Sequence, residues 1–274
     1  MSEYQYGLSS VKRKVLERRL KAYLRKHPEE DIVRGRCVLS TGKMLKIVLL
    51  YTWENTSQSG LADRFKVSQS TVSRTIRWLI PVLGRVLACH RLTLDDLDRW
   101  LDEHPHEPVL VDGTLLPIAR PRQAHKDYGR ANYSGKHQKH GKSTQVVTTT
   151  TGSVLYVSEP QDGRVHDRKA FSETGLEAIL EKSNRQGYGD RGYQGTCLTT
   201  PAKKSKYHPL TIVQKESNKV VNSIRAAVER GISHLKKWNI LSQPNRLRWS
   251  NRDGGYAAAL ALVVGLYGFK RSCK

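Results

Sequence analysis

Hydrophobic residues recur at helical spacing through the first 90 residues of this chain. Segment 9–26 combines a periodic apolar stripe with many lysines and arginines, which predicts a basic amphipathic helix. Its stripe consists of Val11, Val15, Leu16 and Leu20. The charged face suits either solvent or DNA. Segment 41–53 is apolar almost throughout and predicts a buried helix.

Segment 57–83 predicts two short helices joined by a tight turn at Lys66 and Val67, with Ser68 or Ser70 capping the second helix. Pro81 predicts a bend near its end. The pattern is typical of a helix-turn-helix, whose second helix enters a DNA major groove, although a hairpin within a helical bundle has the same pattern. The outward polar residues that we expect to contact DNA are Gln69, Ser70, Thr71, Arg74 and Arg77.

The charge changes sign in segment 91–107, which holds six acids against two arginines. Thr93 and Asp96 have the spacing of a capping box, so a short acidic helix is predicted. Pro105 and Pro108 end this helix. We therefore expect a helical domain over 1–90, an acidic linker helix over 91–107 and a second domain over 108–274.

The second domain begins with two apolar runs on either side of Asp112, in segment 109–118. A carboxylate between buried strand segments is costly to ionise unless a positive charge compensates it. Asp-Gly between apolar runs is also a common hairpin turn. The pattern alone leaves both a turn and a catalytic aspartate open.

Segment 120–142 carries seven lysines and arginines with three histidines, which favours a loop that contacts DNA phosphates through Lys136 and Lys139. His137 and His140 have the spacing of zinc ligands, but no second pair completes a tetrahedral set nearby. Segments 143–150 and 153–158 predict a β-hairpin.

The last third of the chain is basic, with eleven lysines and arginines against two acids over 201–250. Lys203 and Lys204 belong to a basic loop that should contact phosphates. Segment 217–238 predicts a long helix, on which Arg225, Glu229 and Lys236 fall within one stripe. Glu229 is either an exposed residue paired with Arg225 or part of a site.

Composition narrows the class of partner. The formal net charge of +22 over 274 residues favours a polyanion such as DNA. The four cysteines lie far apart and indicate ordinary thiols. The apolar segment near the C-terminus is shorter than the roughly 20 residues of a membrane span, so we expect a buried closing helix and no membrane partner.

Several motifs together resemble the insertion-sequence transposases of the DDE superfamily, in the branch related to Harbinger elements. These motifs are VDGT at Asp112, HD at 166–167, GYGDRGYQG around Asp190, and the R-(three)-E-(six)-K spacing from Arg225 through Glu229 to Lys236. The segment ADRFKVSQSTVSR resembles the helix-turn-helix of that family, while Asn222 stands where the family has a tyrosine.

The resemblance implies an α/β fold with an RNase H-like core, in which Asp112, Asp190 and Glu229 form the catalytic triad and bind Mg²⁺ or Mn²⁺. Two such ions about 4 Å apart would clamp the attacking and leaving oxygens. Asp167 is the alternative second aspartate, although a position at a helix start also suits a simple cap.

The expected function is a transposase that binds the ends of its element, cleaves DNA and transfers the strand, acting as a homodimer or higher oligomer on double-stranded DNA in the cytoplasm of a prokaryote, at the nucleoid. Two alternatives stay open at this point. One is a DNA-binding regulator with an inactive or unused nuclease domain, and the other is a nuclease without strand transfer.

Overall fold

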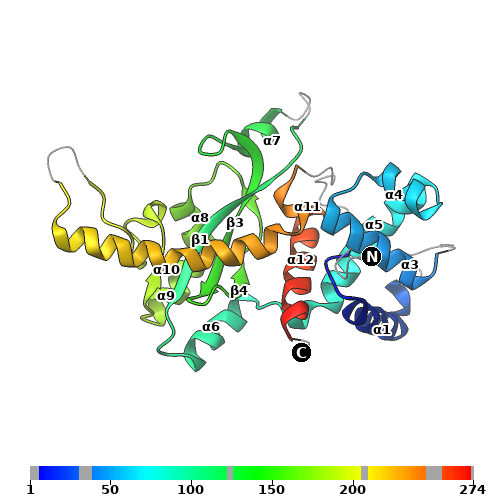
Figure 1. Cartoon of the computed structure of the whole chain (residues 1–274), viewed down its shortest axis with the longest axis horizontal. Helices are drawn as coiled ribbons and strands as arrows, with labels where there is room; N and C mark the ends of the chain where they lie inside the picture. The colour runs from blue at the N-terminus through cyan, green and yellow to red at the C-terminus, as the bar shows by residue number, and fades with distance from the viewer. Residues whose placement is uncertain (1–5, 31–38, 122–125, 205–208, 245–254, 273–274) are drawn as a thin grey trace. The chain divides into compact units, whose positions relative to one another are not determined.

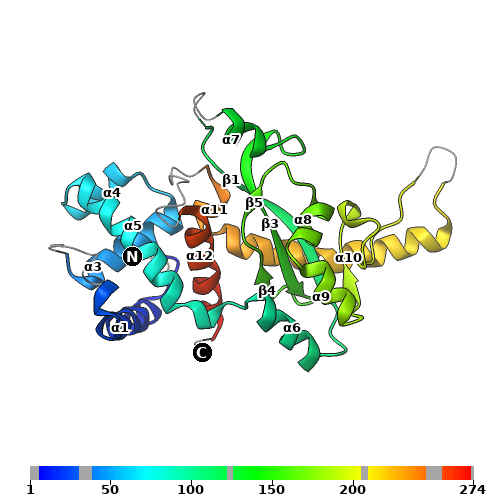
Figure 2. The same cartoon turned by 180° about the vertical axis from the view of Figure 1, so that it is seen from behind.

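The computed structural model of the chain describes residues 6–30, 39–121, 126–204, 209–244 and 255–272. The chain divides into two compact units, whose elements are labelled in Figures 1 and 2. The first unit combines residues 1–91 with 235–274, and the second contains residues 92–234.

The first unit is helical. Its elements are α1 (Ser10–Lys26), α3 (Thr41–Glu54), α4 (Gln58–Phe65), α5 (Gln69–Val86), the short 3₁₀ helix η1 (Ala88–His90), α11 (Asn239–Ser242) and α12 (Gly255–Ser272). A serine precedes each of α1, α3, α4 and α5 and accepts a hydrogen bond from a backbone N–H of the first turn, which stabilises the helix start. These serines are Ser9, Ser40, Ser57 and Ser68.

The helix-turn-helix predicted in 57–83 is present as α4 and α5. Lys66 ends α4 in the left-handed conformation, with φ 54°, and turns the chain toward the next helix. Ser68, not Ser70, caps α5, because its Oγ accepts from the Thr71 backbone N–H at 3.2 Å. Pro81 lies inside α5, which continues to Val86.

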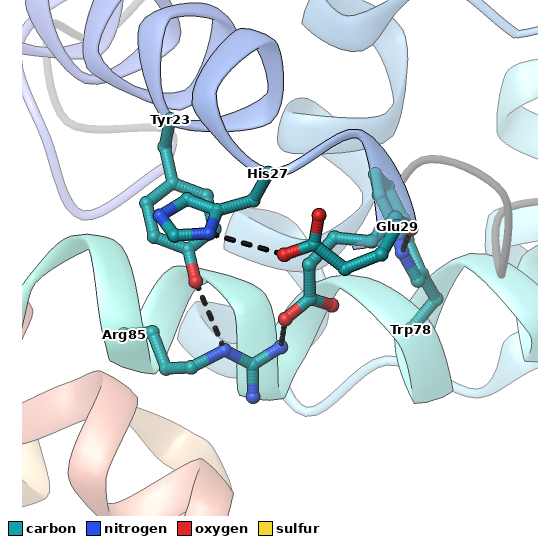
Figure 3. A network of polar contacts seen from close by, with 6 residues as sticks. Tyr23, His27, Glu29, Trp78 and Arg85 are labelled. Atoms are coloured by element: carbon teal, nitrogen blue, oxygen red, sulfur yellow. Dashed lines mark hydrogen bonds and ion pairs between the residues drawn. The ribbon is translucent and has the colours of Figure 1, made fainter.

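The basic helix α1 buries a stripe shifted from the predicted one. Leu16, Leu20 and Leu24 are buried, whereas Val11 is 68% exposed. A polar network attaches the end of α1 to α5, as Figure 3 shows: Arg85 Nε donates to Tyr23 Oη at 3.3 Å. The indole of Trp78, also on α5, donates to the backbone carbonyl of Glu30 at 2.8 Å.

The predicted closing helix is present as α12, and it packs against α5 and η1, while α11 packs against α3. The compact units therefore differ from the predicted domains in two places. Residues 235–274 group with the N-terminal helices, and the acidic helix α6 (Leu94–Glu103) belongs to the second unit. No helix in the described part of the chain is long and apolar enough to cross a membrane.

The second unit contains a mixed sheet. Its remaining elements are β1 (Val109–Pro117), α7 (Lys126–Ala131), β2 (Tyr133–Ser134), β3 (Lys139–Thr149), β4 (Val154–Val157), β5 (Gln161–Asp162), α8 (Asp167–Glu173), α9 (Leu176–Lys182), β6 (Gly187–Tyr188), η3 (Arg191–Tyr193) and α10 (Ile212–Lys236). The antiparallel pair β1–β3 forms its centre, and β6 adds to β1 in parallel. Strands β2, β4 and β5 pair with β3.

Helices cover both faces of this sheet, with α10 on one face and α8 and α9 on the other (Figures 1 and 2). The α8 face is filled by Val111 and Val147 packed against Phe171 and Leu180. Leu97 of α6 joins the same cluster, and the Thr93–Asp96 capping box at the start of α6 is present as predicted. The predicted class, a mixed α/β core with flanking helices after a helix-turn-helix, is confirmed.

Candidate active site

Asp112 lies in the middle of β1 and not in a turn. The strand runs without interruption through Asp112 and Gly113, and Asp112 pairs with Val146 of β3. The hairpin-turn alternative is therefore wrong. Since residues opposite one another in an antiparallel pair share a face, Asp112 and Val146 point to one side of the sheet, and Gly113 and Gln145 to the other.

The second predicted aspartate follows the neighbouring strand. Leu110 of β1 pairs in parallel with Tyr188 of β6, so Asp112 and Asp190 each lie two residues beyond the last pair. The two carboxylates thus lie near each other at this edge of the sheet. Asp190 Oδ1 accepts a hydrogen bond from the Gly192 backbone N–H at 2.7 Å, which fixes its orientation.

Asp167, the first residue of α8, brings a third carboxylate to the same place. A Cβ at position 113 would overlap the Asp167 carboxylate, and one at position 192 would lie 2.8 Å from Asp190 Oδ1 and 3.1 Å from Asp167 Oδ2. Glycines at 113 and 192 therefore leave the space that lets these carboxylates approach.

One lysine joins two of the three carboxylates. Lys136 Nζ lies 3.2 Å from Asp167 Oδ2 and 4.0 Å from Asp190 Oδ2. Burial alone would lower the pKa of Lys136, but the nearby carboxylates, Asp167 first among them, raise it above its usual value. The ammonium is therefore charged and partly balances the cluster.

Asp112 titrates abnormally. Burial, and next the charge of Asp190, raise its pKa to about 6, while Arg225 opposes this shift. Like charges around a desolvated carboxylate disfavour ionisation, and a bound cation would relieve that cost. Among the described residues, no group of three His, Cys, Asp or Glu side chains lies ready-made to hold a metal ion. The oxygen donors nevertheless have the chemistry that Mg²⁺ and Mn²⁺ prefer.

The α10 helix lies on the face to which Asp112 points, since Gly231 packs against Thr148, the partner of Leu110. Arg225 of α10 is half-buried, and its charge acts on Asp112. Glu229 lies one turn later, is exposed, and is not among the charges that act on Asp112. No ion pair joins Glu229 to Arg225 within the described residues.

The residues predicted to contact DNA lie in both units. Gln69, Ser70, Arg74 and Arg77 are exposed on α5, and Thr71 is half-buried. Lys139 begins β3, and Lys203 and Lys204 are exposed in the segment after Thr199. Lys236 is half-buried at the end of α10. Residues 122–125 and 205–208 of the two predicted basic loops lie outside the described residues.

Sequence reasoning missed a buried polar pair behind the cluster. Tyr193 Oη donates to Gln145 Oε1 at 2.5 Å, and both side chains are fully buried. Burial raises the pKa of Tyr193 well above its usual range, so the phenol stays a neutral donor. The single glutamine among the small and β-branched residues of segment 143–150 was the available signal.

Comparison with known proteins identifies the family of the chain. The family described as DDE superfamily endonuclease matches residues 111–264, a span that includes Asp112, Asp167, Asp190 and Glu229. The chain belongs to the DDE superfamily endonucleases. The helix-turn-helix of DDE superfamily endonucleases matches residues 37–89.

Two relatives carry the names of transposases. A protein of Microchaete diplosiphon named as a probable transposase for insertion sequence element IS702 is 30% identical over 215 residues, which cover 76% of this chain and 72% of that protein. A protein of Streptomyces albus G named for IS112 is 29% identical over 225 residues, covering 81% and 80%. No solved structure matches the chain. This DDE superfamily endonuclease is thus a member of a transposase family with an attached helix-turn-helix.

Proposed function

We propose that this DDE superfamily endonuclease binds the ends of its own element, cuts the DNA there and transfers the strand to target DNA. The observation that carries the proposal is the placement of Asp112 and Asp190 side by side at neighbouring strands of a mixed sheet. We assign Asp112, Asp190 and Glu229 as the catalytic triad and the ligands of Mg²⁺ or Mn²⁺.

The side chains of the cluster have two different roles, metal binding and phosphate binding. When bound, the metal would lower the pKa of a water and stabilise charge on the transferring phosphate. Asp112 and Asp190 supply hard oxygen donors and are already close, so little reorganisation is needed to hold a cation between them. Arg225 and Lys136, the two cations whose charges act on Asp112, orient phosphate oxygens at the cluster.

The position of Glu229 on α10 is the reason for assigning it as the third carboxylate. It lies one helical turn after Arg225, on the helix that covers the face to which Asp112 points. Its carboxylate is exposed and makes no ion pair with Arg225 among the described residues. It could therefore serve as a ligand once a bound cation balances the negative charge of Asp112 and Asp190.

The DNA surface is proposed in two parts. Gln69, Ser70, Thr71, Arg74 and Arg77 of α5 would contact base edges and phosphates in a major groove. Lys139, Lys203, Lys204 and Lys236 would contact phosphates alone. Both DNA ends must be held during transfer, so we propose a homodimer or higher oligomer on double-stranded DNA at the nucleoid of a prokaryote.

The test is cleavage of duplexes that carry the DNA flanking the gene on each side, which the proposal expects to contain the element's ends, with Mg²⁺, Mn²⁺ or EDTA. Asp112→Asn, Asp190→Asn and Glu229→Gln should each abolish metal-dependent cleavage and keep DNA binding. Glu216→Gln, which changes another exposed glutamate of α10, is the matched control and should cleave normally. Retained cleavage by Asp112→Asn or Asp190→Asn would refute the assignment.

One observation favours a second function. Glu229 is exposed and lies apart from the charges on Asp112, as expected if the nuclease domain were unused and the protein acted only by binding DNA. Binding without cleavage in any metal would support that regulator. Cleavage without joined product in a strand-transfer assay would instead indicate a nuclease alone.

A further inference from the structure

Lys136 is held at the carboxylate cluster although its side chain is mostly exposed. Its side chain is 65% exposed, compared with 19% for Asp167 and 21% for Asp190. A free lysine on a surface samples many rotamers, and fixing it requires a partner. The shorter of its two contacts, 3.2 Å, is with Asp167 Oδ2.

Asp167 is itself fixed by its surroundings on the α8 face. Its carboxylate fills the space left by Gly113, and Gln145 Nε2 approaches the same point. That amide nitrogen is buried without a hydrogen bond among the described residues, while Gln145 Oε1 accepts from Tyr193 Oη. The space beside Gly113 and the buried Gln145 side chain limit the positions that the Asp167 carboxylate can take.

This approach distinguishes Asp167 from the proposed metal ligands. Asp112 points to the α10 face of β1, while Asp167 meets β1 from the opposite, Gln145 face. Asp167 is thus placed behind the strand, and of the two carboxylates that contact the Lys136 ammonium it is the nearer, at 3.2 Å compared with 4.0 Å for Asp190. A role in holding the lysine fits this geometry better than a role in holding a metal.

Space for a ligand exists beside the pair. A cavity of about 180 Å³ is lined by Lys136 and Asp167 together with Ser134, Arg164 and His166. This is several times the roughly 30 Å³ that one water occupies in the liquid, and it accommodates a phosphate group. Lys136 and Arg164 make its lining positive.

We propose that Asp167 is a positioning residue that holds the Lys136 ammonium beside Asp190, where Lys136 binds the DNA phosphate next to the bond to be cut. The assignment rests on the proposed function and adds to it the residue that positions Lys136 for its phosphate contact. The proposal has an uncommon consequence: Asp167, although negatively charged, should increase the affinity for DNA.

The first test is DNA affinity without cleavage, measured in EDTA at several salt concentrations on a duplex that carries the DNA flanking the gene. Removing an acid ordinarily strengthens DNA binding, and Asp112→Asn should do so. Asp167→Asn should instead weaken binding roughly threefold to tenfold, as should Lys136→Ala. The variant that combines Asp167→Asn with Lys136→Ala should bind DNA no more weakly than Lys136→Ala alone, because both substitutions remove the same phosphate contact.

The matched control is the Asp98–Lys182 pair, a 2.7 Å ion pair between α6 and α9 outside the cluster. Asp98→Asn should leave affinity unchanged or raise it slightly. Lys136→Ala should also flatten the salt dependence by about 0.9 units of slope for its one phosphate. Lys136→Arg, which keeps the charge, should restore most of the affinity.

Tighter binding by Asp167→Asn, or strictly additive effects in the double variant, would overturn the inference. An unchanged salt slope for Lys136→Ala would overturn it even if Asp167→Asn fails to fold. A second measurement, cleavage against Mg²⁺ concentration, should show an unchanged metal midpoint for Asp167→Asn, and a raised midpoint would make Asp167 a metal ligand. Because affinity is measured without cleavage, it tests the role of Asp167 even if the proposed nuclease function fails.

Discussion

At the scale of single residues, the site depends on placing negative charges where water is scarce. Asp112 is the clearest case, because burial and Asp190 raise its pKa to about 6, from 3.8. The folded state therefore binds a proton that the unfolded state has released over this pH range. The ionisation of Asp112 therefore lowers the free energy of unfolding as pH rises from about 4 to about 6, and this loss of stability persists at higher pH.

This sign gives a stability prediction. Asp112→Asn should be more stable than the wild-type protein by about 1–3 kcal/mol at pH 7, and the difference should shrink toward zero near pH 4. Urea unfolding at a series of pH values measures it. Excess Mg²⁺ should stabilise the wild-type protein and not the variant at pH 7. A difference independent of pH would contradict the raised pKa.

Gly113 offers a second prediction at this scale. Gly113→Ala places a methyl group on the Asp167 carboxylate and should destabilise the protein by about 1–3 kcal/mol. The same substitution in an Asp167→Ala background should cost clearly less, since the nearest remaining atom, Gln145 Nε2, lies 3.3 Å from the added Cβ. Equal costs in both backgrounds, measured by urea unfolding, would mean that Asp167 does not occupy that space.

At the scale of elements, helix starts were predictable from sequence because their signals are local. Thr93 and Asp96 form the predicted capping box, and the turn at Lys66 ends α4 where it was predicted. The choice between Ser68 and Ser70 could not be predicted in this way, since either serine can precede a helix. The buried stripe of α1 was also not predictable from its own sequence, because packing against other helices decides that Leu24 is buried and Val11 is not.

The cap provides an element-scale prediction. Ser68→Ala should lower the free energy of unfolding by about 1 kcal/mol, because the Thr71 backbone N–H loses its acceptor. Ser70→Ala, a substitution of the neighbouring exposed serine, should change it by less than about 0.5 kcal/mol. Thermal and urea unfolding of the two variants compares them. A larger decrease for Ser70→Ala would place the helix start at the other serine.

The candidate site was only partly predictable from sequence, because its residues are brought together by contacts between distant parts of the chain. Asp112 and Asp190 could be named from motifs, but their proximity depends on the parallel pairing of β1 with β6, a non-local contact. Asp167 was named as an alternative to Asp190, whereas the structure brings both to one cluster. Gln145 and Tyr193 carried no signal beyond polarity, because only folding places them behind Gly113.

At the scale of the whole molecule, the chain has a net charge of +22, and its two units differ in how they can contact DNA. The α5 helix presents Gln69, Ser70 and Arg74 at an exposed helix start, where base edges can be read. Lys203 and Lys204 are exposed in a segment without regular secondary structure and can offer mainly charge. Sequence preference should therefore belong to the first unit and general affinity to the second.

This division predicts unlike effects from similar substitutions. Arg74→Ala should cost roughly 1–3 kcal/mol on the element's own ends and little on scrambled DNA, if the guanidinium pairs with a guanine. Lys203→Ala and Lys204→Ala should weaken binding to both duplexes alike and reduce the salt slope by about 0.9 for each phosphate that the variant no longer neutralises. Titration of the three variants against both duplexes at several salt concentrations distinguishes these effects. Equal weakening on both duplexes for Arg74→Ala would mean that α5 holds phosphates only, and sequence preference would then have to come from the second unit.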